Sequence, residues 1–187
     1  ISFYGKTKKQ AENLLRKYNK MYGINCISLR FFNVGGSDPE YDIGIFNKSP
    51  THLIPSILNA SKLNNPIKIY GRNYNTHDGT CIRDYIHIMD VVSIHLKILE
   101  KISQGSIKST ALNVGTGVGH SVLDVVKLAE KITDKKIELE YMDRREGDPK
   151  EIVASNDKIK KCIEWHPSFP LKKIIQDAYI WHSGYVP

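Results

Sequence analysis

Short strand-like segments alternate with amphipathic helical segments along the whole chain, and this alternation is what most limits its fold. Residues 4–22 carry apolar side chains at helical spacing, and Gly23 stands where helices often end. Further helices are expected over residues 51–62, 90–103, 121–133, 156–163 and 171–183, with Ser121 and Asp124 in a capping-box pattern. Strands are expected over residues 25–30, 67–70, 81–87, 111–114 and 137–141. This order of strands and helices predicts an α/β fold.

The composition is that of a folded chain, with 41% hydrophobic and 25% charged residues among 187. The longest apolar runs have the length of strands, which argues against a membrane-spanning helix. The net charge is +7, from 27 Lys and Arg against 20 Asp and Glu, but the lysines are spread along helices beside acids. We therefore interpret the charge as a solvated surface and expect neither nucleic acid nor a membrane as a partner.

The cysteines Cys26, Cys81 and Cys162 are widely spaced, without a Cys-x-x-Cys pair or a histidine at metal-ligand spacing. They predict neither a disulfide framework nor a metal site. Free thiols are typical of a reducing compartment, so we expect a cytoplasmic protein.

Tyr4 and Lys8 are four residues apart in the first predicted helix, so their side chains leave the same face. A phenol is a poor base at neutral pH, and a neighbouring ammonium group lowers the pKa of such a phenol. A pair of this kind can move a proton to or from a sugar hydroxyl in hydride-transfer enzymes. The spacing is also expected by chance in a chain with 10 tyrosines and many lysines, so an ordinary amphipathic helix explains it equally well.

A glycine-rich segment, Gly115–His120, follows a predicted strand and precedes a predicted helix. This is the context of a dinucleotide-binding fingerprint, but His120 stands where the third glycine should be. We interpret the segment as a tight strand-to-helix connection, with dinucleotide binding as the alternative.

Two polar segments offer guanidinium groups that could bind a diphosphate. Arg83 lies in a predicted extended segment, where it could hold a diphosphate or pair with Asp84 on the surface. Arg145 and Asp148 lie in a charged turn that could hold a phosphate and a ribose, or could be only a solvated turn. His87 is better explained as a hydrogen-bonded structural residue than as a catalyst. The residues alone leave these alternatives open.

Six sequence segments are informative as an ordered set, although each is weak evidence by itself. They are residues 4–8 (YGKTK), 29–33 (LRFFN), 52–55 (HLIP), 78–87 (DGTCIRDYIH), 113–124 (NVGTGVGHSVLD) and 144–149 (RREGDP). In this order, and at about this spacing, they resemble the UDP-glucose (UDP-galactose) 4-epimerases of the extended short-chain dehydrogenase/reductase superfamily. The resemblance spans nearly the whole chain and corresponds to the C-terminal part of these proteins.

The resemblance implies roles for individual residues. Tyr4 and Lys8 are expected to form the catalytic pair and, with Phe32, to contact the cofactor, which would be NAD. Arg83 and Arg145 match phosphate-binding arginines, Asp148 matches the acid that reaches the uridine ribose, and Tyr70 would stack on uracil. The substrate-binding residues implied by the resemblance are Asn33, His52, Leu53, Lys68, Ile69, Tyr70, Arg83, Arg145, Asp148 and Ile152.

The implied reaction is the NAD-dependent interconversion of UDP-glucose and UDP-galactose in galactose metabolism. The base would take the proton of the sugar 4-hydroxyl while a hydride passes from C4 to NAD, and the hydride would return to the other face of the 4-keto sugar. The resemblance also implies a homodimer. The alternatives are another nucleotide-sugar enzyme of the superfamily, such as a 4,6-dehydratase or a decarboxylase, and a sugar-nucleotide-binding module without catalysis.

The resemblance also implies a division into domains. Residues 1–35 would end a Rossmann-type NAD-binding domain, and residues 36–187 would form mainly a smaller α/β substrate domain, with some segments returning to the first. The chain starts at Ile1 and leads directly into a helix, so we expect the latter part of a longer protein. We expect these 187 residues alone to bind NAD weakly or not at all, and to be inactive. His52, in place of a frequent asparagine, would change a hydrogen bond to the nucleotide but not the fold. Ile152, at a variable position beside the sugar, leaves the preference for N-acetylated sugars open.

Overall fold

Helices and strands alternate along residues 3–38, 40, 42–45, 47 and 49–184, which the computed structural model describes. The strands are β1 (Ile27–Phe31), β2 (Asn33–Gly35), β3 (Ile67–Tyr70), β4 (Ile82–His87), β5 (Thr110–Val114), β6 (Gly119–Ser121), β7 (Leu139–Met142) and β8 (Glu151–Ile152). The helices are α1 (Phe3–Tyr22), α2 (Leu53–Leu63), α3 (Ile88–Ser103), α4 (Val122–Thr133), α5 (Asp157–Ile163) and α6 (Leu171–Gly184). All the helices and strands expected from the sequence are present, with ends displaced by no more than two residues.

Most of the strand pairs are parallel, as the alternation of strands and helices requires. Strand β1 pairs with β5, β3 pairs with β7, and β4 pairs with both β2 and β8, all in parallel. The antiparallel pair joins β4 to β6. The predicted α/β fold is therefore confirmed, although the short strands β2, β6 and β8 were not predicted.

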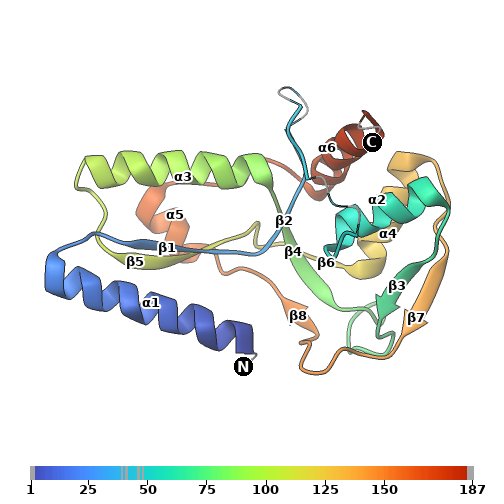
Figure 1. Cartoon of the computed structure of the whole chain (residues 1–187), viewed down its shortest axis with the longest axis horizontal. Helices are drawn as coiled ribbons and strands as arrows, with labels where there is room; N and C mark the ends of the chain where they lie inside the picture. Colours follow the sequence, from blue (N-terminus) through green and yellow to red (C-terminus); the bar gives the residue numbers. More distant parts are fainter. Residues whose placement is uncertain (1–2, 39, 41, 46, 48, 185–187) are drawn as a thin grey trace.

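Two hydrophobic clusters lie at opposite ends of the molecule, and β4 passes between them (Figure 1). The first packs α3 and α5 against the β1–β5 pair, with Ile94, Ile98, Leu112, Val114, Ile159, Ile163 and Trp165 at its centre. The second packs α2, α4 and α6 with β3, through Ile57, Ile69, Val125, Ile174 and Ile175. The domain boundary at residue 35 stays a prediction.

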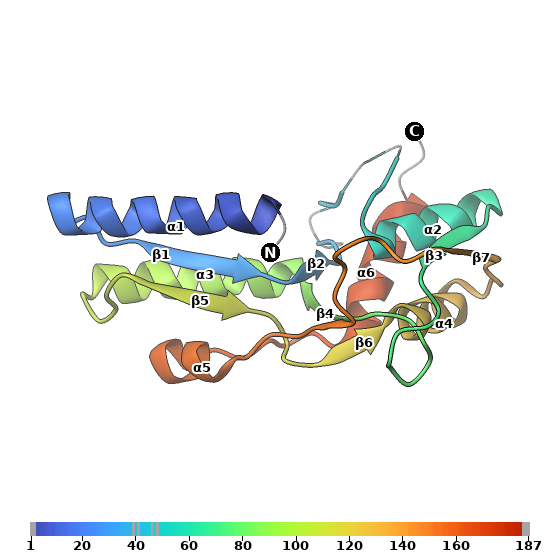
Figure 2. The same cartoon turned by 90° about the horizontal axis from the view of Figure 1, so that it is seen from below.

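The helix α1 lies on the opposite side of the β1–β5 pair from α3 (Figure 1). None of its described residues is buried, and its Glu12 accepts two hydrogen bonds from the guanidinium group of Arg30 on β1, at 2.7 and 2.6 Å. These hydrogen bonds hold the pKa of Glu12 below its usual value. Because α1 runs antiparallel to β1 in both views, its N-terminal end lies at the carboxyl end of that strand (Figure 2).

The three cysteines, Cys26, Cys81 and Cys162, are free thiols. Among the described residues, no helix combines the length and the apolar character needed to span a membrane.

His87 connects the end of β4 to α6. Its ring is 1% exposed and stacks on Phe169, with 4.4 Å between the ring centroids. Its Nδ1 accepts the N–H of Met89 at 3.0 Å, which caps α3, so the proton is assigned to Nε2, which lies 3.2 Å from an Asp177 carboxylate oxygen on α6. The structural role expected for His87 is therefore confirmed.

This buried histidine makes the stability of the protein depend on pH. Burial lowers the pKa of His87 below its ordinary value of 6.5, and the nearby Asp177 carboxylate opposes that shift. The unfolded chain therefore binds a proton before the folded chain does as the pH falls. The free energy of unfolding should then fall below about pH 6.5, by at most about 1.4 kcal/mol per pH unit from this one group.

Urea unfolding between about pH 7.5 and 5 measures this effect. In His87→Asn the amide oxygen can still accept the Met89 N–H, but the side chain no longer titrates. The variant should therefore lose less stability than the parent over this range. Equal losses in the two proteins would show that His87 is not the titrating group.

Candidate functional site

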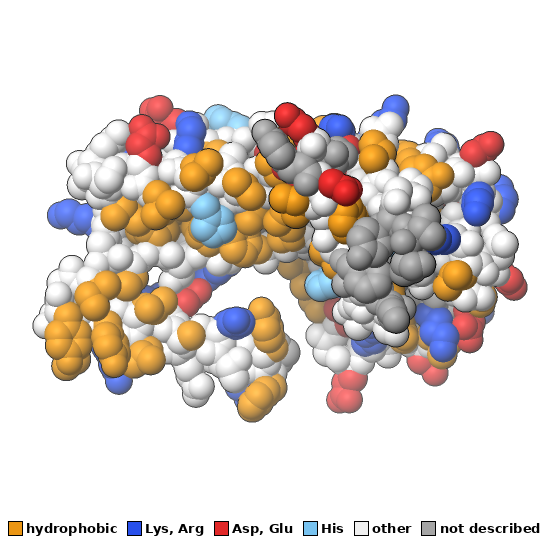
Figure 3. Space-filling view, turned by 45° about the horizontal axis from the view of Figure 1, so that its top comes forward, with side chains coloured by type: hydrophobic (Ala, Val, Ile, Leu, Met, Phe, Trp, Pro, Cys, Tyr) orange, Lys and Arg blue, Asp and Glu red, His pale blue; other side chains and the backbone are white. Residues whose placement is uncertain are grey.

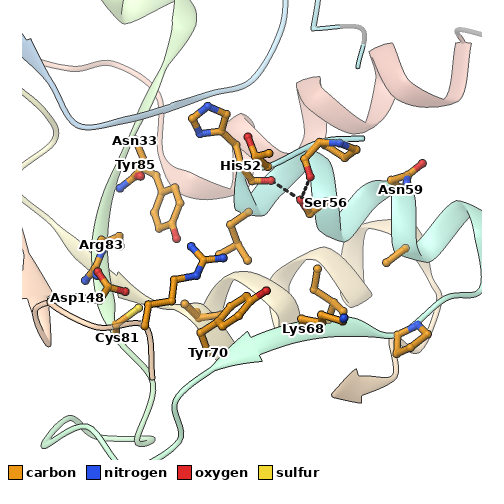
Figure 4. A pocket seen from close by; sticks show the side chains of 18 of the residues that line it. Asn33, His52, Ser56, Asn59, Lys68, Tyr70, Cys81, Arg83, Tyr85 and Asp148 are labelled. Atoms are coloured by element: carbon orange, nitrogen blue, oxygen red, sulfur yellow. Dashed lines mark hydrogen bonds and ion pairs between the residues drawn. The ribbon is translucent and has the colours of Figure 1, made fainter. Parts of the chain in front are cut away.

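A cavity of about 860 Å³ opens between α2, β3 and β4 (Figure 4). It brings together residues that are far apart in the sequence and that the resemblance assigned to substrate binding: Asn33, His52, Leu53, Lys68, Tyr70, Arg83, Arg145 and Asp148. The permanent charges among them are those of Lys68, Arg83, Arg145 and Asp148. Three positive charges against one negative charge suit a ligand that carries more than one negative charge.

The alternation of side chains along β4 decides which of its residues reach this cavity. Arg83 and Tyr85, with Cys81 just before the strand, share one face and line the cavity. Asp84 points to the opposite face and is fully buried. The surface pairing of Arg83 with Asp84, which the sequence left as an alternative, is therefore wrong.

Arg83 is held by two contacts inside the molecule. One terminal nitrogen donates to a carboxylate oxygen of Asp148 at 2.5 Å, and the other donates to the carbonyl oxygen of Ile82 at 2.7 Å. The Arg83 side chain is 12% exposed and that of Asp148 is 28% exposed. The guanidinium group is thus fixed at the wall of the cavity and is not a freely solvated surface group.

Asp84 organises the glycine-rich segment that follows β5. Its carboxylate accepts the N–H groups of Thr116 and Gly117 at 2.9 Å each, the hydroxyl of Thr116 at 2.5 Å, and the N–H of Ala154 at 3.1 Å. A Cβ added to Gly115 would lie 2.6 Å from one of the Asp84 oxygens, so a side chain would not fit there. The backbone of this segment turns toward a protein carboxylate, as expected for a structural connection.

The charged turn of residues 144–149 contributes to the cavity with some of its side chains only. Arg145 lies over the ring of Tyr70, with its Cζ atom 3.8 Å from the ring centroid. Arg144 instead lies over Tyr74, at 4.1 Å, and its Nε donates to the side-chain oxygen of Asn73 at 2.6 Å. Arg145, which the resemblance matched to a phosphate-binding arginine, lines the cavity, and Arg144 does not.

The stretches expected to embrace a nucleotide lie on two sides of the cavity, one at the start of α2 and the other on β3 (Figure 4). His52 precedes α2, and its side chain is exposed, as is that of Lys68 on β3. Ile69 is different, because its side chain is 1% exposed and belongs to the second hydrophobic cluster. Only the backbone of Ile69 is therefore available for a ligand.

Tyr4 and Lys8 are placed together, but apart from this cavity. The Lys8 Nζ lies 5.4 Å from the centroid of the Tyr4 ring, and the Tyr4 side chain is 69% exposed. The described residues that line the cavity do not include Tyr4, Lys8, Phe32 or Ile152. Figure 3 shows the molecule hollowed between α1 and the end that carries the cavity.

The structure adds lining residues that the sequence did not single out as ligand contacts, among them Ser56, Asn59, Cys81, Tyr85 and Val122. Burial raises the pKa of the Tyr85 phenol well above its usual value, so this hydroxyl stays protonated and can donate a hydrogen bond. Burial also raises the pKa of the Cys81 thiol, which keeps it unreactive. The position of Tyr85, two residues after Arg83 on one strand, is a signal that could have identified it.

A second cluster of polar groups, His77, Asp78 and Asp124, lies at the start of α4. The His77 Nε2 lies 3.5 Å from Asp78 and 3.3 Å from Asp124, but the facing oxygens already accept the O–H and the N–H of Ser121. The positive end of the helix dipole at this point also disfavours a cation. We interpret the cluster as part of the cap of α4, whose predicted capping box at Ser121 and Asp124 is confirmed.

Comparison with known proteins agrees with this geometry. Residues 1–115 match the NAD dependent epimerase/dehydratase family. The chain is 40% identical to the UDP-glucose 4-epimerase of Streptococcus mutans serotype c, over 99% of this chain and 56% of that protein. It also resembles the crystal structure of a UDP-glucose 4-epimerase from Stenotrophomonas maltophila with bound NAD and formylated UDP-arabinopyranose (TM-score 0.90, 31% identity, 98% of this chain and 55% of that one).

A further solved structure, a UDP-glucose 4-epimerase from Bifidobacterium longum in complex with NAD+ and UDP, matches with a TM-score of 0.87 and 28% identity, over 97% of this chain and 54% of that one. The chain thus spans about half the length of the relatives that it matches. The family match includes α1, which carries Tyr4 and Lys8, and β4, which carries Arg83. The order of the sequence segments, the fold and this match agree, and the chain belongs to the NAD-dependent epimerase/dehydratase family.

Proposed function

We propose that this chain provides the UDP-sugar site of a UDP-glucose 4-epimerase, an enzyme that interconverts UDP-glucose and UDP-galactose. The observation that carries the proposal is the convergence of Tyr70, Arg83, Arg145 and Asp148 on one cavity. An aromatic ring can stack on uracil, guanidinium groups bind a diphosphate, and a carboxylate accepts hydrogen bonds from ribose hydroxyls. The names of the relatives, and the ligands in the titles of the solved structures, support the same function.

NAD is the cofactor that we propose for this reaction, with Tyr4, Lys8 and Phe32 at its nicotinamide end. Tyr4 and Lys8 offer a hydroxyl and an ammonium group on one face of α1, at the carboxyl end of β1, where ligands bind in open α/β sheets. The glycine-rich segment does not fit the pyrophosphate, because its N–H groups donate to Asp84. When bound, NAD would supply a reversible acceptor for the hydride of the sugar C4.

We assign substrate binding and proton transfer to residues of this chain. Arg83 and Arg145 bind the diphosphate, and the stacking face of Tyr70 orients the base. Tyr4 takes the proton of the sugar 4-hydroxyl and later returns it, and the positive charge of Lys8 stabilises the phenolate form of this tyrosine. Because the protein holds the nucleotide, the sugar can turn about its bonds to the diphosphate and present its other face.

Removing either arginine tests this proposal. Arg83→Ala and Arg145→Ala should each weaken UDP binding by about ten-fold to more than a hundred-fold, because each removes a charge-assisted hydrogen bond worth about 1.5–3 kcal/mol. Lysine at either position should restore binding only in part, because it keeps the charge but loses the planar, bidentate group. Titration calorimetry with UDP measures both effects.

Arg72→Ala is the matched control for this titration. The guanidinium group of Arg72 lies 5.7 Å from the Tyr141 ring centroid, and Arg72 does not line the cavity. UDP affinities equal to that of the parent in both Arg83→Ala and Arg145→Ala would remove the two residues from the site and overturn the proposal.

Two finer expectations accompany the proposed function. The homodimer is implied by the resemblance to the epimerases. The cytoplasmic location rests on the three free thiols, which are typical of a reducing compartment. Both stay predictions.

A further inference from the structure

The groups that the proposed function assigns to the ligand are paired with one another in this structure. Arg145 lies on the ring of Tyr70, and Asp148 is paired with Arg83. We propose that the turn of residues 145–148 is a latch that occupies the nucleotide site itself, with Arg145 in the place of the base and Asp148 in the place of the diphosphate. This inference rests on the proposed function and adds a regulation of the same site.

The contact between Arg145 and Tyr70 leaves no room for a base. Non-bonded atoms approach to about 3.5–4.0 Å, so a planar group placed between the guanidinium and the ring would need about twice that separation. The observed distance from the Arg145 Cζ to the ring centroid is 3.8 Å. Both residues line the cavity, so the guanidinium covers a face of the ring that a ligand would use. A base can stack on this face only after Arg145 has moved.

The contact between Arg83 and Asp148 similarly fills the position of a phosphate. A carboxylate and a phosphate both accept the parallel N–H groups of a guanidinium, so they compete for the same edge. Here one terminal nitrogen of Arg83 is bound to Asp148 and the other to the Ile82 carbonyl oxygen. A diphosphate must therefore displace Asp148, or share the guanidinium with a like charge beside it.

One short turn carries both halves of the latch. The N–H of Asp148 donates to the carbonyl oxygen of Arg145 at 3.2 Å, and Gly147 lies between them with a φ of +74°, a conformation that favours glycine. The two side chains are therefore fixed to one compact unit and should leave their partners together. A ligand with both a base and a diphosphate compensates for both lost contacts at once, whereas a ligand with only one of them compensates for half.

The latch makes a crossed prediction for ligand fragments. Uridine has a base without phosphate, and inorganic pyrophosphate has phosphates without a base. In Arg145→Ala the face of Tyr70 is free, so uridine should bind about two- to five-fold more tightly, as expected for an exposed cation–π contact, while pyrophosphate should bind about ten-fold or more weakly. A residue that only contacts the ligand would not strengthen the binding of either fragment.

Asp148→Asn tests the other half of the latch. It removes the negative charge that faces Arg83 and keeps the shape of the side chain, so pyrophosphate should bind more tightly than to the parent, by about two- to ten-fold. Arg144→Ala is the matched control for Arg145→Ala, because it removes the same positive charge from the neighbouring position, at a side chain directed to Tyr74 and Asn73. We expect it to bind all the probes within about two-fold of the parent.

Calorimetric titration of the whole chain and its variants with UDP, uridine and pyrophosphate distinguishes the outcomes. Tighter uridine binding in Arg145→Ala together with tighter pyrophosphate binding in Asp148→Asn supports the latch. If UDP binds the parent but Arg145→Ala binds uridine equally or more weakly, the latch is wrong and the proposed function stands. If UDP does not bind the parent, the proposed function is wrong and the latch is overturned with it.

Discussion

Asp84→Ala should lower the free energy of unfolding by about 3–5 kcal/mol, because it removes a fully buried carboxylate that accepts three backbone N–H groups, and a donor left unpaired in the interior costs about 1–3 kcal/mol. The carboxylate is 0% exposed and holds the N–H groups of Thr116, Gly117 and Ala154 at 2.9, 2.9 and 3.1 Å. All these donors are uncharged, so the backbone itself compensates for the buried charge. Urea unfolding at neutral pH measures the loss.

Two further variants make this measurement decisive. Asp84→Asn keeps the shape and one oxygen, but directs an NH₂ group at backbone donors, so it should also destabilise the protein, by less than the alanine variant. Asp143→Ala replaces an exposed aspartate and should change the stability by no more than about 0.5 kcal/mol. A loss below about 1 kcal/mol in Asp84→Ala would show that water or another acceptor replaces the carboxylate.

Tyr4→Phe is expected to lower the turnover of the active protein by about 10²–10⁴-fold, the usual contribution of general acid–base catalysis. The variant keeps the ring and removes only the hydroxyl whose proton the proposed mechanism transfers. UDP affinity should stay close to that of the parent, since Tyr4 does not line the cavity that carries Arg83 and Arg145. The rate of UDP-glucose and UDP-galactose interconversion and a UDP titration together check both statements.

Tyr18→Phe provides the control on the same helix. Tyr18 is also partly exposed on α1, and its ring lies 5.4 Å from that of Tyr22, but it is almost four turns away from Tyr4. Turnover should be unchanged in this variant. If Tyr4→Phe also turns over at the parent rate, another group transfers the proton.

The longer helices and strands could be predicted from the sequence, whereas the shortest strands could not. Helices of 7–20 residues and strands of 4–6 residues carry enough side chains to show a period, and these were predicted. The strands β2, β6 and β8 have two or three residues, which is too short for a period, and all three form by pairing with β4. Their existence depends on a neighbour in space, and the local sequence does not contain that information.

The site could be predicted in part for a similar reason. The resemblance to the epimerases pointed to Tyr70, Arg83, Arg145 and Asp148, which the structure places on one cavity. The pairing of Arg83 with Asp148 joins residues 65 positions apart and has no local signal. In contrast, strand geometry alone excludes a pairing of Arg83 with the adjacent Asp84, because neighbours on a strand point to opposite faces.

This alternation on β4 also limits how the strand can change in length. Inserting or deleting a single residue before Arg83 would exchange the two faces of the strand. The cation would then meet the backbone N–H groups of residues 116 and 117, and the carboxylate of Asp84 would enter a cavity that otherwise attracts anions. Ligand binding in the cavity and the hydrogen bonds that hold the glycine-rich segment would therefore be lost together. Residues of β4 can therefore be exchanged one by one, whereas a change in the length of this strand should disrupt both of its faces.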